Sequence, residues 1–391
     1  MNTTTAAHIP FVNTETDCRL FTQHFGNSVV ARICIDNFQK LRPKLPQVLN
    51  VWIDAGLDAL DHLRDGDVPR DFVRQFGDSA LIQSLASGNA DKKADVQQFV
   101  NALLNKTKVA KPTWLSIPQL PLVEGSTRNK TNRLLAEATR SWATEQGYRG
   151  KLILPIIVTN QRQINKKTDR DVKVKVIKSC YEKAAADGLW IVESSLNDQE
   201  GSGKFDNLRF PSLIKFHQEV AAALPAESIS VAGPYWGLNL VLWARGIAKH
   251  PVVGLGNSFQ YRIPGGHMQP SSARIALSPL KRLAVMKPDL KSWLSQSLSV
   301  IPMGDPAHAQ LQYLLKNFDR LQSQESRTQV AKFYKDWFDR IAATNPAGRA
   351  LALYQDFSSA YVLGKGLPNL PDEKTARRPE RIAQQLMLTC L

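Results

Sequence analysis

The sequence predicts an α/β protein: a (β/α)8-like parallel barrel with an α-helical C-terminal extension. Short apolar runs that end in polar residues or glycine alternate with amphipathic helices, which is typical of a parallel sheet. The segment that holds these runs is about 250 residues long, the usual length of a (β/α)8 barrel. Beyond residue 304 the apolar residues recur only at helical spacing, which indicates a separate helical region.

Six apolar runs have the composition of buried strands, and they cover residues 51–54, 114–118, 152–158, 189–193, 229–233 and 252–256. Residues 274–278 and 298–302 are weaker candidates for a seventh and an eighth strand. An open doubly wound sheet is the alternative architecture. It is disfavoured because the turn after the first run, Ala55-Gly-Leu-Asp58, contains no G-x-G-x-x-G sequence.

Apolar residues three and four apart predict helices between these strands, over residues 70–106, 132–146, 172–186, 211–224 and 238–248. The same spacing predicts C-terminal helices over residues 311–321, 330–341, 347–361 and 379–388. We therefore divide the chain into an N-terminal lead-in (1–48), a barrel (49–303) and an α-helical C-terminal subdomain (304–391). Within the lead-in, residues 28–35 have the composition of a strand.

The composition constrains partners and location. A net charge of +15 and a pI near 9.7 favour contact with a polyanion, so we expect DNA or RNA as a partner. No apolar run approaches the roughly 20 residues that span a bilayer, and the N-terminus lacks the features of a signal peptide. We expect no membrane partner and a cytoplasmic location. The four cysteines are far apart, which predicts reduced thiols rather than a zinc site or a disulfide framework.

Three carboxylates follow predicted strands and are the candidate catalytic residues: Asp54, Glu193 and Glu124. In a barrel the carboxyl ends of all strands meet at one mouth. Paired carboxylates there can act as nucleophile, general acid or general base, as in glycosidic-bond chemistry. The alternative is structural, since each of them could instead cap the next helix or pair with an arginine.

The candidate substrate-binding residues lie in the loops after the later strands. Aromatic faces in the Gly233-Pro-Tyr-Trp-Gly237 loop suit stacking on a base or sugar, and the basic run 162–183 suits phosphates. The alternatives are aromatic packing and a solvated helix face. The set comprises Asn160, Arg162, Lys166, Lys167, Tyr235, Trp236, Asn257, Tyr261 and Arg262.

These features favour a barrel-mouth enzyme that acts on nucleic acid or a nucleotide-like substrate, with glycosidic-bond chemistry (transglycosylase or hydrolase) as the best single assignment. The alternative is a non-catalytic nucleic-acid-binding component of a phage-related or host-defence assembly, and a small-carbohydrate hydrolase is a third reading. No metal-binding motif is present, so we expect no cofactor, although a carboxylate-bound magnesium stays open. Asp54 and Glu193 facing one another across an open pocket would favour catalysis, whereas burial with arginines would favour binding.

Overall fold

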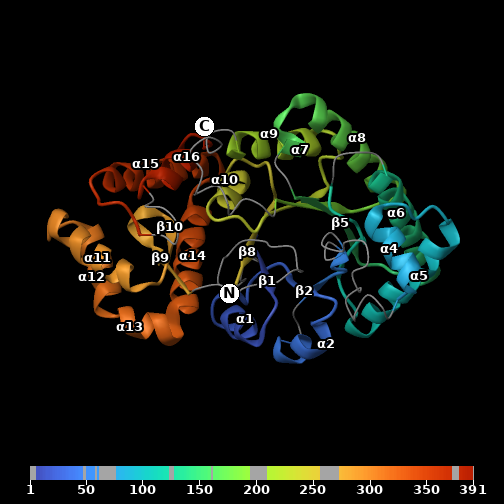
Figure 1. Cartoon of the computed structure of the whole chain (residues 1–391), viewed down its shortest axis with the longest axis horizontal. Coiled ribbons are helices and arrows are strands. Elements are labelled where there is room, and N and C mark those ends of the chain that lie inside the picture. The colour runs from blue at the N-terminus through green and yellow to red at the C-terminus, as the bar shows by residue number, and fades with distance from the viewer. Residues whose placement is uncertain are drawn as a thin grey trace.

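A computed structural model describes residues 6–46, 50–57, 60, 76–122, 127–159, 162–193, 209–255, 273–371 and 378–390. Eight parallel strands follow one another around a closed barrel, and β1 pairs with β8 to complete it (Figure 1). The strands are β1 (Ile9–Val12), β2 (Ala31–Cys34), β3 (Val51–Asp54), β4 (Trp114–Ser116), β5 (Lys151–Val158), β6 (Gly188–Glu193), β7 (Ile229–Ala232) and β8 (His250–Gly254). The fold is the (β/α)8-like barrel that the sequence predicts.

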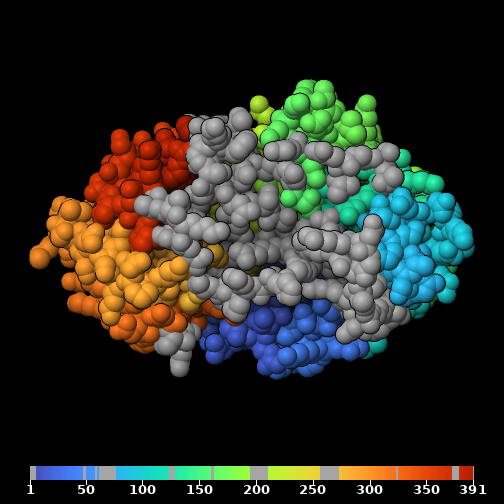
Figure 2. Space-filling model, in the orientation of Figure 1, coloured from blue at the N-terminus to red at the C-terminus, as the bar shows by residue number. Residues whose placement is uncertain are grey.

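Helices follow most strands and cover the outside of the barrel. Those in the barrel region are α1 (Glu15–Leu20), α2 (Phe38–Leu41), α4 (Ser79–Ser87), α5 (Lys93–Asn105), α6 (Thr127–Glu145), α7 (Arg162–Asn165), α8 (Lys167–Ala184), α9 (Arg209–Ala222) and α10 (Leu238–Ala244). Their apolar faces pack on the strands because strands and helices bury the same core. Figure 2 shows α4 and α5 (cyan) at one end of the molecule and the C-terminal region (orange and red) at the other.

The N-terminal part of the chain belongs to the barrel, which corrects the predicted lead-in. Residues 1–48 include β1 and β2, and the register joins Phe11 to Arg32 and Arg32 to Trp52. The six runs predicted with most support are β3 to β8. The barrel therefore extends from β1 to β8 rather than from residue 49 to 303.

The two weaker strand predictions do not close the barrel. Residues Arg274–Leu277 form β9, which pairs antiparallel with β10 (Arg282–Val285) in a separate two-stranded sheet. Residues 298–300 form the end of helix α11 (Pro288–Val300). Both runs are apolar because they face a second core outside the barrel, so hydrophobicity alone could not distinguish them from barrel strands.

The C-terminal region is helical, as predicted, and it starts with this hairpin. After α11 come α12 (Pro306–Lys316), α13 (Phe318–Arg320), α14 (Ser326–Ala343), α15 (Arg349–Lys365) and α16 (Arg381–Met387). The buried side chains of α14 belong to the barrel core, whereas those of α11 and α12 belong to the second core. Helix α14 therefore joins the C-terminal region to the barrel (Figure 1).

Candidate functional site

Aromatic rings from non-adjacent strands fill the interior of the barrel. Phe11 on β1 and Trp52 on β3 each meet Trp190 on β6, with ring centroids 5.2 and 5.5 Å apart. Nearer the amino ends of the strands, Trp114 lies 5.8 Å from His250. Strands that are not neighbours in the sheet can make such contacts only across the lumen, so the barrel interior is a packed core rather than a pore.

Arg32, in the middle of β2, is in register with Phe11 and Trp52 and forms an ion pair with Asp54 at the end of β3. Both side chains are at most 5% exposed. A second guanidinium nitrogen, Nη1, donates to Asn13 Oδ1 at 3.1 Å, just beyond β1. The guanidinium carbon lies 4.5 Å from the centre of the Phe11 ring and 5.6 Å from that of Trp190. The arginine of β2 thus reaches across the lumen toward β6 at the carboxyl end of the barrel.

The turn that follows β3 passes close to the Asp54 side chain and to Cys34. The Gly56 N–H points to Asp54 Oδ1 at 3.4 Å. Gly56 has a φ of 68°, and a Cβ there would lie 3.0 Å from Cys34 Sγ, so a side chain would be both strained and crowded. Burial raises the pKa of the Cys34 thiol well above its usual value, which favours the neutral thiol.

The second predicted carboxylate, Glu193, ends β6 and is 1% exposed. It lies beside Tyr235, whose pKa is raised well above its usual value mainly by burial and then by the charge of Glu193. The Tyr235 hydroxyl donates to the Ile191 carbonyl at 3.3 Å and lies 3.4 Å from His217 Nε2. Tyr235 therefore fixes the backbone at the end of β6, next to the carboxylate.

The two aromatic residues predicted to stack on a ligand are packed inside the protein. Tyr235 is 1% exposed, and Trp236 is 6% exposed. The indole N–H of Trp236 donates to the Lys281 carbonyl at 2.8 Å, and its ring stacks on Phe333 of α14 at 6.0 Å. This placement follows the alternative of aromatic packing that the sequence left open.

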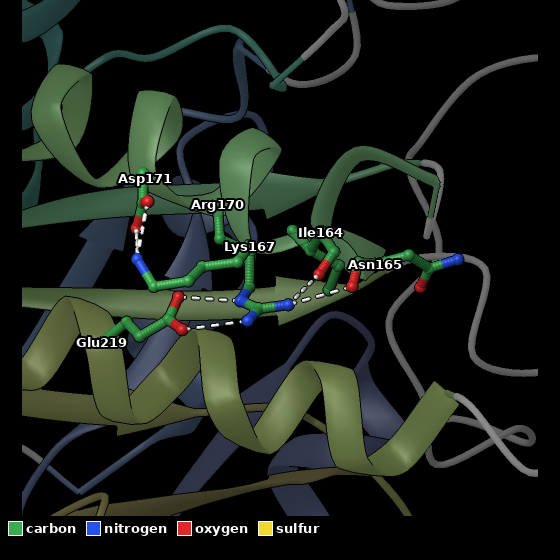
Figure 3. A network of polar contacts seen from close by, with 6 residues as sticks. All are labelled: Ile164, Asn165, Lys167, Arg170, Asp171 and Glu219. Carbon is green, nitrogen blue, oxygen red and sulfur yellow. Dashed lines mark hydrogen bonds and ion pairs between the residues drawn. The ribbon is translucent and has the colours of Figure 1, made fainter.

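Several side chains of the basic run after β5 are paired within the protein, and Figure 3 shows the pairs of Lys167 and Arg170. Arg170 is buried, binds Glu219 on α9 with two nitrogens at 2.7 and 3.0 Å, and donates to the carbonyls of Ile164 and Asn165 at the end of α7. Lys167 is exposed and pairs with Asp171 one turn later. Arg170, on α8, thus ties the short helix α7 to α8 and α9.

The remaining candidates divide into two groups. Lys166 precedes α8 and is exposed, while Arg162 begins α7 and its side chain is outside the description. Five predicted site residues lie outside the described residues: Glu124, Asn160, Asn257, Tyr261 and Arg262. The structure therefore brings together Asp54 with Arg32, and Glu193 with Tyr235, near the carboxyl ends of their strands.

Sequence reasoning missed Arg32. The signal was present, because a single arginine interrupts the apolar run Val29-Val-Ala-Arg-Ile-Cys-Ile35. A charge in the middle of a strand that is buried on both faces needs a partner inside the barrel. Because residues 1–48 were not assigned to the barrel, this partner could not be inferred.

Within the described ranges, no three His, Cys, Asp or Glu side chains gather in a group that could hold a metal ion. All four cysteines are free and buried. No helix in the described part of the chain combines the length and apolar character that crossing a membrane requires.

A scan against protein-family models finds no match for this chain, and a search of curated proteins also finds none.

Proposed function

We propose that the protein is a barrel-mouth enzyme that acts on nucleic acid or a nucleotide-like substrate, with Asp54 and Glu193 as its reacting carboxylates. The observation that carries the proposal is that both side chains end strands of a closed parallel barrel, on β3 and β6. Barrel enzymes place their catalytic groups at these positions. Fold alone does not fix the reaction, so the environment of each carboxylate has to carry the argument.

The two carboxylates have different surroundings, which suits different roles. Asp54 accepts from the Arg32 guanidinium, so part of its hydrogen-bonding capacity is already in use. A carboxylate held in this way suits a nucleophile or a stabiliser of positive charge on a sugar ring. Glu193 is 1% exposed at the end of β6, and a carboxyl group in a buried site suits proton transfer to a leaving group. This division of roles fits the cleavage of a glycosidic bond.

The phosphate-binding part of the proposal depends on charge. The chain carries a net charge of +15, and the exposed Lys166 and Lys167 follow α7 at the end of β5. Exposed lysines near a barrel mouth attract phosphates through an interaction that weakens with salt. The ion pair of Lys167 with Asp171 reduces its contribution, since part of its charge is compensated locally.

One observation favours the second candidate, a non-catalytic nucleic-acid-binding protein. Asp54 is buried with Arg32, an arrangement that can serve structure alone. In this reading Arg32 and Asp54 stabilise the barrel, and the basic surface does the binding.

The first test is a salt titration of binding to labelled single- and double-stranded DNA and RNA. The wild type is compared with a Lys166→Ala, Lys167→Ala double variant. A second double variant, Lys291→Ala and Lys365→Ala, removes the same charge from the C-terminal helices. We expect affinity to fall steeply with salt and to fall further in the first variant than in the second. If the wild type binds none of these probes at low salt, the nucleic-acid proposal is wrong.

A further inference from the structure

The loop after β1 is organised by a buried aspartate. Asp17 lies in the first turn of α1, and its Oδ2 accepts from the backbone N–H groups of Asn13 and Thr14, each at 2.8 Å. The Thr14 hydroxyl in turn accepts from the Asp17 N–H at 3.3 Å, which completes a capping box. Asp17 therefore sets the path of the chain where it leaves β1.

Arg327 of the C-terminal region holds the other oxygen of this aspartate. Its Nη2 pairs with Asp17 Oδ1, and its Nε and Nη2 donate to the Leu255 carbonyl at 3.0 and 2.5 Å. Leu255 follows β8, so Arg327 spans the seam where β8 and β1 close the barrel. Arg327 lies in the first turn of α14, where a positive charge opposes the helix dipole. Its position is thus not explained by the stability of its own helix.

Asn13 connects this seam to the candidate site. Its backbone N–H is bound by Asp17, while its side-chain oxygen accepts from Arg32 Nη1 at 3.1 Å. Arg32 in turn pairs with Asp54. Arg327, Asp17, Asn13, Arg32 and Asp54 are thus joined by one continuous line of hydrogen bonds, which passes through the backbone N–H and the side chain of Asn13 and which we call the polar chain.

We infer that Arg327 is a positioning residue for the barrel mouth: acting through Asp17 and Asn13, it sets the orientation of the Arg32 guanidinium that holds Asp54. The effect of Arg327 on substrate rests on the proposed function, in which Asp54 is a reacting carboxylate. Under that function, Arg327 makes the C-terminal region part of the substrate site. Its physical basis is that the guanidinium of Arg32 is planar and has directed donors. A shift of Asn13 therefore changes the way Arg32 meets Asp54.

Removal of Arg327 should disturb the polar chain and leave the rest of the fold unchanged. Without Arg327, Asp17 keeps a buried charge whose Oδ1 has lost its guanidinium partner. The aspartate can then turn toward solvent, and its hold on the Asn13 and Thr14 N–H groups weakens. The weakened hold on Asn13 would then change the orientation of the Arg32 guanidinium. Its central carbon lies 5.6 Å from the centre of the Trp190 ring, so the environment of Trp190 reports this change.

The test uses the full chain labelled with 5-fluorotryptophan and observed by 19F NMR. The Trp190 line is assigned by its loss in Trp190→Phe. Trp293, which is buried in the second core, provides a reference line within the same molecule. The variants are Arg327→Met, Arg32→Met and their combination, with Arg32→Lys as a substitute where Arg32→Met does not fold. Arg320→Met is the matched control, since this exposed arginine pairs with Glu325 in the same region.

We expect Arg327→Met to shift the Trp190 line and to leave the Trp293 line in place. Arg320→Met should change neither line. In the Arg32→Met background, Arg327→Met should add no further shift, because Arg32 carries the effect. A Trp190 line that does not move, or a shift that persists without Arg32, would overturn the inference. Movement of the Trp293 line with that of Trp190 would indicate a general structural change and would also overturn it.

The same variants are then titrated with the labelled oligonucleotide that the wild type binds best. We expect Arg327→Met to weaken binding about fivefold or more, and to have no added effect once Arg32 is replaced. If the wild type binds no oligonucleotide, the proposed function fails, while the NMR result still decides whether Arg327 positions Arg32.

Discussion

The Arg32 guanidinium on β2 and the Asp54 carboxylate on β3 form a buried ion pair at the carboxyl end of the barrel, with side-chain exposures of 5% and 4%. Two adjacent strands thus place opposite charges side by side, where either charge alone would be costly. The pair links the stability of the barrel to the chemistry proposed for its mouth.

Replacement of one partner should destabilise the protein far more than replacement of both. We expect Arg32→Met and Asp54→Leu each to lower the free energy of unfolding by about 3–5 kcal/mol, because each leaves a buried charge without its partner. The double variant should lose much less than the sum of the two. Urea denaturation of all four proteins gives the coupling energy. Additive losses would show that the two side chains do not depend on each other.

Asp54→Asn and Glu193→Gln test catalysis directly. Both changes keep the size of the side chain and remove its charge. With an oligonucleotide substrate, we expect each to lower the rate of base or sugar release by at least about a hundredfold. Binding of the oligonucleotide should change much less. A wild type that binds the oligonucleotide but releases no product would favour the non-catalytic alternative.

Trp236 should matter for stability and not for ligand stacking. Its ring packs on Phe333, and its N–H donates to the Lys281 carbonyl. We expect Trp236→Ala to lower the free energy of unfolding by about 3–5 kcal/mol, the usual cost of removing a buried aromatic side chain. Trp236→Phe keeps most of the packing and should leave oligonucleotide affinity unchanged. A selective loss of affinity in Trp236→Phe would restore the stacking role that the sequence suggested.

His8 is a buried polar residue in an apolar site. Its ring meets Phe25 and Phe338 edge-on, and neither of its nitrogens has a hydrogen-bond partner among the described residues. His8→Leu should therefore stabilise the protein by about 1–3 kcal/mol, since it removes a desolvated polar group at similar volume. His250→Leu is the control, because His250 Nδ1 lies 2.8 Å from the Ala7 carbonyl and this variant should destabilise. The thermal midpoints of both variants are compared with that of the wild type.

Acid should destabilise the fold partly through two histidines. Burial lowers the pKa of both His8 and His217 to about 3. The unfolded chain binds protons near pH 6.5 and the folded chain does not, so stability is present above pH 6.5 and is lost as the pH falls toward 3. Each histidine adds a slope of up to about 1.4 kcal/mol per pH unit in this window.

The measurement is the free energy of unfolding at several pH values between 7 and 4. His8→Leu should reduce the slope by the contribution of one group. An unchanged slope would mean that His8 takes up its proton in the folded protein as readily as in the unfolded one.

Strands β3 to β8 could be predicted because each is an apolar run bounded by turn residues and followed by a helical pattern. No predicted strand covered β1 (Ile9–Val12), and β2 is interrupted by Arg32, which weakens its apolar pattern. Residues 274–277 and 298–300 were predicted as barrel strands but lie outside the barrel. They are apolar because they face the second core, and a local pattern does not specify which core a segment joins.

The candidate site divides in the same way. The positions of Asp54 and Glu193 followed from their place at the ends of strands, since the carboxyl ends of parallel strands meet at one mouth. Their partners could not be predicted, because Arg32 meets Asp54 only after two strands pair, and Tyr235 meets Glu193 only after β7 joins β6. The burial of Trp236 depends on α14, which lies about 100 residues later in the chain and packs on the indole ring only in the folded protein.

The sequence by itself determined the alternation of strands and helices, the helical C-terminal region and the strong positive charge. These are local or additive properties, and each can be read from spacing or composition. Only the tertiary structure decided which strands close the barrel, which charges pair inside it, and that Arg327 reaches its seam. Contacts of this kind join residues far apart in the chain, and their energy comes from burial and geometry that exist only in the folded protein.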